Sequence, residues 1–314
     1  MPLVLLFLGI AVLTIISLFT GVTDIHYREL FHQEDKLLVF TITRIPRTLT
    51  LLLLGAGMSI SGAIMQQLSQ NRFVSPTTSG ALESAKMGIL IALILFPGVS
   101  FMGRLGLSLV VTFFCSSLFM GFIAKIPLRS TVFITLVGII FGSILNALAT
   151  FFAYKHNIVQ NVQEWLLGDF SSVMQGQYEA VYIVVPAVIL VYFYADRFTL
   201  AGMGESFAVN LGLSYQAVLR IGLLAVSLVV SVSMVTVGAL PFVGLIIPNM
   251  VRIYRGDNLR PNLPWIAGMG SVFLLVCDIF SRLIVYPYEI PIGVTVGVIG
   301  GISFLVLILR KEAQ

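Results

Sequence analysis

Long apolar stretches separated by short polar connections make up most of the chain. Eight stretches are continuous and close to the roughly 20 apolar residues that a helix needs to cross the hydrocarbon layer of a membrane. They cover residues 3–21, 48–67, 105–124, 131–154, 178–195, 221–240, 265–286 and 292–309. Strands of a membrane β-barrel would instead alternate apolar and polar positions over about ten residues, so the pattern favours helices.

Two further stretches carry a weaker signal of the same kind. One covers residues 80–96 and contains Glu83 and Lys86, and the other covers 242–254 and is interrupted by Pro248. Adding them brings the count to about ten helices. The sequence therefore predicts an all-α integral membrane protein with about ten transmembrane helices.

The composition supports this assignment. Of the 314 residues, 58% are hydrophobic and 10% are charged, whereas a soluble domain carries roughly 25% charged residues to cover its surface. A cytosolic enzyme and a nucleic-acid-binding protein are therefore excluded, and we expect residues 1–314 to form a single transmembrane domain. Cys115 and Cys277 lie inside apolar stretches, where thiols behave as small hydrophobic side chains.

The distribution of Lys and Arg orients the predicted helices, because cytoplasmic loops of membrane proteins are enriched in these residues. With the N-terminus inside and ten spans, most of the 18 basic residues fall on the inner side. Most of the 14 acidic residues fall on the outer side. The sequence therefore favours an even number of spans with both termini in the cytoplasm.

Motifs for bond-making chemistry are absent from the sequence. It contains no GxxxxGK[ST] phosphate loop, no HExxH or EF-hand pattern and no GxSxG elbow. The three histidines are scattered through predicted loops. We therefore expect no catalytic residue, no bound metal and no cofactor held by the chain itself.

Two pairs of charges lie inside predicted spans. Glu83 and Lys86 are three residues apart, and Asp278 and Arg282 are four residues apart, so each pair can neutralise itself on one helix face. Charges at membrane depth are also candidates for a functional role. Both interpretations remain open at this point.

The segment 198–220 is too polar to span the membrane. It contains a short apolar pattern at Phe207 and Leu211, followed by Gly212, which is typical of a helix end. The pattern is compatible with an amphipathic helix lying on the membrane surface. It is equally compatible with a docking element for a soluble partner.

Several motifs resemble a known family. The run 44–47 (RIPR) followed by 55–67 (GAGMSISGAIMQQ) is similar to the RxPR…SGxxxQ signature of FecCD-type permeases. These are the membrane subunits of ABC importers for ferric siderophores, haem and vitamin B12. The further matching motifs, in chain order, are 203–205, 210–212, 238–248, Arg252, 256–257, 263–264, Asp278 with Arg282, and 289–293.

The resemblance implies a type II ABC importer permease architecture with ten helices in a bacterial cell membrane. It implies a second permease subunit, either identical or a paralogue, and two cytoplasmic ATPase subunits that use the ATP. It also implies an extracytoplasmic siderophore-binding protein that delivers the cargo for transport by alternating access. In this family much of the ligand selection is implied to lie in the binding protein.

Particular residues take roles by the same resemblance. The cytoplasmic coupling segment would lie at about 198–220, with the coupling residues Gly204, Glu205, Asn210 and Gly212. Docking of the binding protein would use Arg44, Arg47 and Arg282, the last only if the outer end of its span is exposed.

Three departures from the family pattern identify a branch. The family usually has PH where this chain has PN at 248–249, and NPLAxP where it has RFVSP at 72–76. The third predicted span begins with GALESAK at 80–86, where the family has small residues. Together with GMGESF and IYRGDN, these resemble the branch for petrobactin-, anguibactin- or vibriobactin-type ferric siderophores.

Two further hypotheses rest on position in the spans alone. Met65, Gln66 and Asn146 are candidates for lining the pore or gate. The alternative function is an ion-coupled secondary transporter, in which the intramembrane charges Glu83, Lys86 and Asp278 form a relay.

Overall fold

A computed structural model describes residues 3–21, 34–125 and 131–312. Every regular element in these ranges is helical. The α-helices are α1 (Leu3–Phe19), α2 (Glu34–Val39), α3 (Ile45–Leu68), α4 (Ala81–Leu95), α5 (Phe101–Lys125), α6 (Thr131–Lys155), α7 (Val159–Leu167), α8 (Val184–Gly202), α9 (Glu205–Asn210), α10 (Tyr215–Thr236), α11 (Val243–Arg255), α12 (Leu259–Leu283) and α13 (Ile292–Glu312). A π-helical turn (Phe40–Arg44) precedes α3, and a 3₁₀ turn (Glu179–Ile183) precedes α8.

The prediction of about ten membrane helices is confirmed. Six helical segments in the described part of the chain are long and apolar enough to cross a membrane, and they contain α3, α5, α6, α8, α10 and α12. The helices α1 and α13 are apolar but shorter. The two weakest predicted spans are also helices, α4 with 15 residues and α11 with 13 residues.

The segment between α8 and α10 is shorter than the sequence indicated. Of the expected range 198–220, residues 198–202 belong to α8 and residues 215–220 belong to α10. The polar side chains at these positions do not end either helix, because Phe198 and Ala201 of α8 and Val218 of α10 are buried against neighbouring helices. The connection itself is therefore limited to residues 203–214, with α9 inside it.

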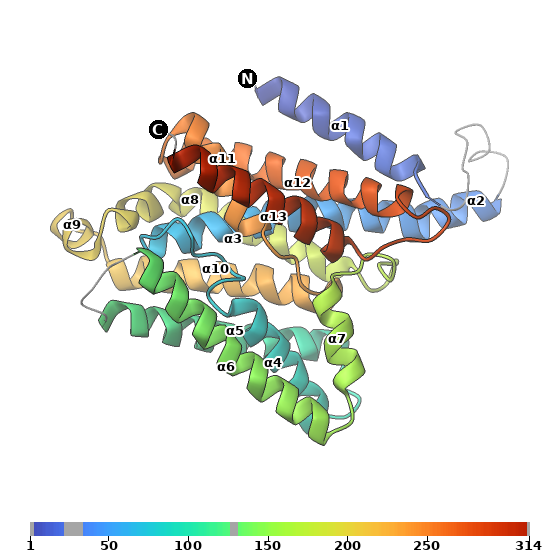
Figure 1. The fold of residues 1–314 in the computed structure, drawn as a ribbon, viewed down its shortest axis with the longest axis horizontal. Coiled ribbons are helices and arrows are strands. Elements are labelled where there is room, and N and C mark those ends of the chain that lie inside the picture. Colours follow the sequence, from blue (N-terminus) through green and yellow to red (C-terminus); the bar gives the residue numbers. More distant parts are fainter. Residues whose placement is uncertain (1–2, 22–33, 126–130, 313–314) are drawn as a thin grey trace.

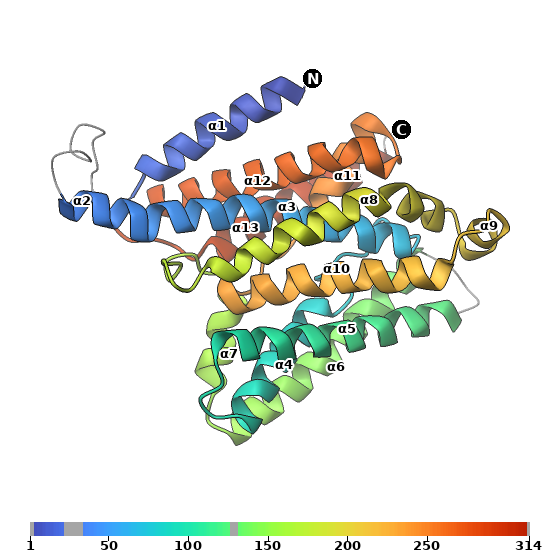
Figure 2. The same cartoon turned by 180° about the vertical axis from the view of Figure 1, so that it is seen from behind.

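Helix α3 runs through the middle of the bundle, between α12 on one side and α10 on the other (Figures 1 and 2). It packs against α8, α10, α11 and α12, and nearly all of its second half is buried. The short helix α9 lies at one end of the bundle and α2 at the other. We refer to these as the α9 end and the α2 end.

Small residues allow α3 to approach its neighbours closely. A Cβ atom at Gly55 would lie 2.6 Å from the carbonyl oxygen of Gly270 in α12, and one at Gly62 would lie 1.8 Å from that of Gly244 in α11. The Ser59 hydroxyl donates a hydrogen bond to the carbonyl oxygen of Ile266 (2.9 Å). Helices in lipid associate mainly through such close packing and interhelical hydrogen bonds, because apolar burial gives no net driving force there.

Non-helical segments near the α2 end pair with each other through their backbones. The Ala239 N–H donates to the carbonyl oxygen of Trp165 (2.9 Å), and the Asp169 N–H donates to that of Val237 (2.8 Å). The Gly293 N–H donates to the Gly168 oxygen (3.0 Å) at the start of α13. Irregular backbone at membrane depth needs partners inside the protein, and these bonds join the end of α7, the α10–α11 connection and α13.

The contact between α3 and α12 gives a test of the packing. In Gly270→Ala the new methyl group would lie 2.2 Å from the carbonyl oxygen of Gly55, so the two backbones must separate. Overpacking of this kind costs about 1–3 kcal/mol. We expect a lower thermal unfolding midpoint for the detergent-solubilised protein. The control is Gly121→Ala in α5, where the methyl group enters open space; equal midpoints for the two variants would contradict the close approach.

Candidate functional site

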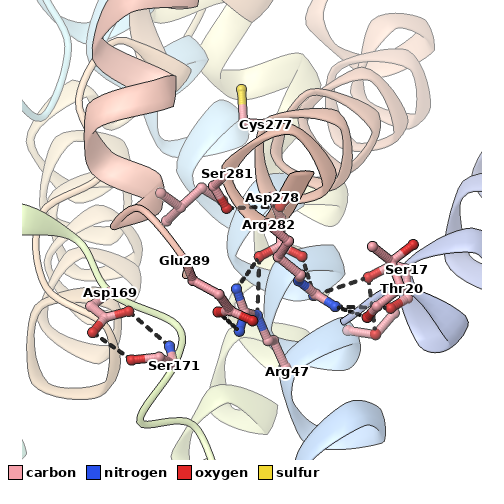
Figure 3. Close-up of polar contacts among 12 residues, drawn as sticks. Ser17, Thr20, Arg47, Asp169, Ser171, Cys277, Asp278, Ser281, Arg282 and Glu289 are labelled. Carbon is pink, nitrogen blue, oxygen red and sulfur yellow. Dashed lines mark hydrogen bonds and ion pairs between the residues drawn. The ribbon is translucent and has the colours of Figure 1, made fainter. Parts of the chain in front are cut away.

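Charged side chains gather where α3, α12 and the α12–α13 loop meet at the α2 end (Figure 3). Arg47 donates to Asp278 Oδ1 from both Nε (3.0 Å) and Nη2 (2.8 Å). Its Nη1 donates to Glu289 Oε2 (2.6 Å). Hydrogen bonds between an arginine and a carboxylate are charge-assisted and roughly twice as strong as neutral ones. Arg47 therefore fixes α12 and the following loop against the first turn of α3.

Arg282 lies on the other side of Asp278 and joins α1 to the same group. It forms an ion pair with Asp278 Oδ2, which confirms the predicted contact between these two residues. It also donates to the carbonyl oxygens of Ser17 (3.0 Å) and Thr20 (2.8 Å). These carbonyls end α1, where the helix dipole favours a cation.

The exposure that docking would require of Arg282 is not found. Its side chain is 2% exposed, because α1 covers it and its donors are directed to Asp278 and the end of α1. The condition set for a docking role of Arg282, an exposed outer end of its span, is therefore not met in this structure.

Arg44 completes the group, which we call the charge cluster: Arg44, Arg47, Asp278, Arg282 and Glu289. Arg44 lies in the π-helical turn before α3 and is buried. Its guanidinium rests on Gly21, where a Cβ would lie 1.9 Å from Nη1. The cluster contains more guanidinium groups than carboxylates, so it carries an excess positive charge at the α2 end.

The α12–α13 loop lies next to the charge cluster and is anchored to it. Besides the contact between Glu289 and Arg47, the Ile290 N–H donates to the carbonyl oxygen of Ser281 (3.1 Å). Tyr286 and Tyr288 in this loop are exposed. Aromatic side chains beside a charged group are typical of protein interfaces.

At the α9 end, glycines shape the connection between α8 and α10. Gly204 has φ 116° and Gly212 has φ 78°, backbone conformations that glycine adopts without strain. Gly204 precedes α9 and Gly212 follows it. The four predicted coupling residues therefore all lie in the connection between α8 and α10, with Glu205 and Asn210 exposed at the two ends of α9.

Apolar side chains on this connection are also exposed. They are Met203, Phe207, Val209 and Leu211, while Ala208 is buried against the neighbouring helices. Helix α9 contacts α8 and α10, and it projects from the bundle in both views (Figures 1 and 2).

The intramembrane residues Glu83 and Lys86 form no direct ion pair, although they are near enough to attract each other electrostatically. Among the ion pairs of the described residues this pair is not found; the Lys86 ammonium instead donates to Asn146 Oδ1 of α6. The long lysine side chain reaches across to the neighbouring helix rather than back along its own. Glu83 faces Gly142 of α6, where a Cβ would lie 3.5 Å from Oε2. The Lys86 side chain thus joins α4 to α6, whereas the buried Glu83 Oε2 lies beside α6 without a hydrogen-bond partner.

The three pore candidates are not in one environment. Met65 and Gln66 are buried inside the bundle, and Gln66 Nε2 donates to the carbonyl oxygen of Leu245 in α11 (3.4 Å). Asn146 lies on the exposed side of α6. Their role in a pathway stays a prediction.

Sequence reasoning missed the partners that come from distant segments. Glu289 belongs to a motif that matched the family, but no role was assigned to it. Asp257 at the α9 end forms ion pairs with Arg252 and with Arg72 (3.5 Å), again without a spacing signal. Within the described part of the chain, no three or more His, Cys, Asp or Glu side chains gather as a metal site would require.

The buried part of the charge cluster can be tested by removing its central carboxylate. Asp278 is fully buried between Arg47 and Arg282, so Asp278→Asn leaves the buried Arg282 without its carboxylate partner and Arg47 with Glu289 alone. Breaking a buried ion pair in this way costs about 3–5 kcal/mol. We expect a loss of this size in the free energy of unfolding, measured by SDS titration in mixed micelles.

The matched control is Asp196→Asn, which removes the carboxylate of an exposed pair with Arg260. We expect this variant to unfold like the unaltered protein, because exposed ion pairs contribute little. Equal losses for the two variants would show that Asp278 is not central to the cluster.

The chain was compared with known proteins. The family model of the FecCD transport family matches residues 9–310. The petrobactin import system permease protein YclN of Bacillus subtilis (strain 168) is 48% identical over 309 residues, covering 98% of each chain. The ferric-anguibactin transport system permease protein FatD of Vibrio anguillarum is 41% identical over 295 residues, covering 94% of each.

A solved structure supports the same assignment. It is described as an inward-facing conformation of a metal-chelate type ABC transporter, and it matches with a TM-score of 0.83 and 26% identity over 98% of each chain. The resemblance inferred from the sequence motifs is thus confirmed independently by family model, relatives and fold. The chain belongs to the FecCD transport family.

Proposed function

We propose that this chain is the membrane permease subunit of an ABC importer that carries a ferric siderophore into the cytoplasm. The observation that carries the proposal is the 48% identity, over 98% of both chains, to a petrobactin import permease. The relatives that transport vitamin B12 are only 30% identical. A siderophore of the petrobactin or anguibactin type is therefore the favoured cargo. The chain moves its cargo by alternating access and makes or breaks no bond.

The energy for transport comes from partner subunits. The chain has no phosphate loop, and α9 presents exposed apolar side chains at the end of the bundle. An apolar helix surface of this kind is suited to a groove on a soluble protein. Two cytoplasmic ATPase subunits would bind here, on the connection that contains Gly204, Glu205, Asn210 and Gly212.

A binding protein would dock at the opposite end. The charge cluster has an excess of positive charge beside the exposed loop aromatics Tyr286 and Tyr288. Arg47 keeps a small exposed fraction that acidic groups on the binding protein could meet, whereas Arg44 is buried and would contribute through the positive field of the cluster. Such charge complementarity steers encounter and orientation. Arg282 would contribute indirectly, because it holds Asp278 and the end of α1 in place beside Arg47.

The protein is a multi-pass membrane protein of the inner or plasma membrane. We place both termini in the cytoplasm, because the N-terminal end of α1 and the C-terminal end of α13 lie toward the α9 end (Figures 1 and 2). A second permease subunit, identical or paralogous, would cover the exposed side of α6, which carries the polar residues Ser143 and Asn146 as well as apolar ones.

The ion-coupled alternative is not favoured. A relay needs titratable groups that face one another along a path. Asp278 is held between Arg47 and Arg282, whereas Lys86 is bound to Asn146 on a different pair of helices. These charges therefore stabilise helix contacts rather than form one chain of groups.

Uptake of iron chelates by cells tests the proposal. Cells that produce this chain with its ATPase and binding protein should accumulate ⁵⁵Fe supplied as ferric petrobactin or ferric anguibactin. Accumulation should stop when ATP is depleted and continue when a protonophore removes the proton gradient. Vitamin B12 uptake by the same cells serves as the control cargo. Loss of iron uptake with the protonophore while ATP is maintained would favour the ion-coupled alternative.

The coupling role of α9 is tested by Glu205→Ala. The Glu205 side chain is exposed at the first position of α9, so its removal leaves the packing of the bundle unchanged. In the reconstituted importer we expect less iron uptake per ATP hydrolysed. Glu164→Ala, at an exposed position of α7, is the control. An unchanged ratio for Glu205→Ala would remove this residue from the coupling surface.

A further inference from the structure

Two adjacent glutamines end α3, and they have different partners. Gln66 is directed to α11, where it bonds to Leu245, whereas Gln67 is directed to the α9 end. Successive residues point about 100° apart around a helix, so this separation follows from the geometry. Only Gln66 falls within the family signature, and Gln67 has no role from the sequence.

Gln67 touches α8 just before the connection that contains α9. A Cβ atom at Gly202 would lie 1.9 Å from Gln67 Oε1, so the glutamine side chain occupies the space that a larger residue would take. Gly202 is the last residue of α8, two positions before Gly204. The side chain of Gln67 is therefore in direct contact with the helix end from which the α9 connection departs.

The other end of the same amide reaches the α11–α12 turn. Gln67 Nε2 donates to the carbonyl oxygen of Asp257 (3.4 Å). The Asp257 carboxylate in turn binds Arg252 of α11 and Arg72 of the α3–α4 loop. Gln67 is 8% exposed, so this bond is largely screened from water. One side chain thus bridges α8 and the turn that joins α11 to α12.

Helix α10, which follows the connection, also meets α3 at this level. A Cβ atom at Gly222 would lie 2.8 Å from Leu68 Cδ1 and 3.1 Å from Ile64 Cγ2. The helices on both sides of α9 therefore approach the last turns of α3 through a glycine. Closely packed helices of this kind transmit a displacement from one to the next, because a packed interior has low compressibility.

We propose that Gln67 is a positioning residue for ATP-driven transport: it holds the end of α8 to the α11–α12 turn, so that a displacement of α9 moves α3 and α11 together. The inference rests on the coupling role of α9 proposed above. Helix α9 has only six residues and few neighbours, so a force on it reaches the bundle through the ends of α8 and α10. Gln67 is the polar contact between the end of α8 and the α11–α12 turn at Asp257.

The test uses the whole importer, isolated through a tag on this chain and reconstituted with its binding protein in liposomes. Two rates are measured, ATP hydrolysis and uptake of ⁵⁵Fe-petrobactin, and their ratio reports coupling. In Gln67→Ala and Gln67→Met we expect the ratio to fall by roughly fivefold or more. Gln67→Met keeps the length of the side chain and removes its N–H donor, which separates hydrogen bonding from packing.

A purely structural role would lower the thermal unfolding midpoint and reduce both rates together. The proposal requires the unfolding midpoint and ATP hydrolysis to stay near those of the unaltered complex while uptake falls. The exposed glutamine variant Gln163→Ala in α7 is the matched control and should keep the original ratio.

Gly202→Ala disrupts the same contact from the α8 side, because its methyl group displaces Gln67 Oε1. We expect it to lower the ratio, and we expect the double variant with Gln67→Ala to be no worse than Gln67→Ala alone. An unaltered ratio in Gln67→Ala, or a double variant restored to the original ratio, would overturn the proposal. Absence of ATP-driven uptake by the unaltered complex would instead contradict the proposed function.

Discussion

The structure depends on a single constraint, the passage of α3 through the centre of a helix bundle in lipid. Because lipid chains are as apolar as the helices, close contact has to come from small side chains and interhelical hydrogen bonds. Gly55 and Gly62 allow the backbones of α12 and α11 to approach, and Ser59 adds a hydrogen bond to α12. The neighbours of α3 are therefore placed by their contacts with it, and the less buried helices α6 and α13 form the outside.

This central helix also connects the two ends at which partners would bind. Its 24 residues, each rising 1.5 Å, make a rod of about 36 Å. Arg47 in its first turn contacts Asp278 and Glu289, and Gln67 in its last turn contacts Gly202 and Asp257. One continuous, largely buried helix thus carries contacts at both ends. We expect binding at one end and displacement at the other to be joined through it.

The sequence predicted the parts of this arrangement that depend on local pattern. The length of the apolar stretches alone predicted the ten helices, including α4 despite its charges and α11 despite Pro248. The contact between Asp278 and Arg282 followed from their spacing on one helix. Spacing carries no such information for Arg47 and Glu289, which are 242 positions apart. For Glu83 and Lys86 spacing did not reveal the hydrogen-bond partner, because the long lysine side chain reaches Asn146 on α6. The ends of α8 and α10 were missed because buried residues such as Phe198, Ala201 and Val218 extend these helices past their polar positions.

The residues of the charge cluster indicate a role beyond stabilising the fold. Buried ion pairs stabilise a fold less than apolar side chains of similar volume, because desolvation offsets much of the attraction. Leucine or phenylalanine at these positions would pack α1, α3 and α12 without that cost. Stability alone therefore does not account for a fully buried Asp278 between Arg47 and Arg282. An orienting role does account for it, since the carboxylate holds Arg47 in one direction, with a small exposed fraction next to the α12–α13 loop. The buried Asp278 then holds the positive Arg47 where an acidic partner would arrive, and its desolvation is the cost of that orientation.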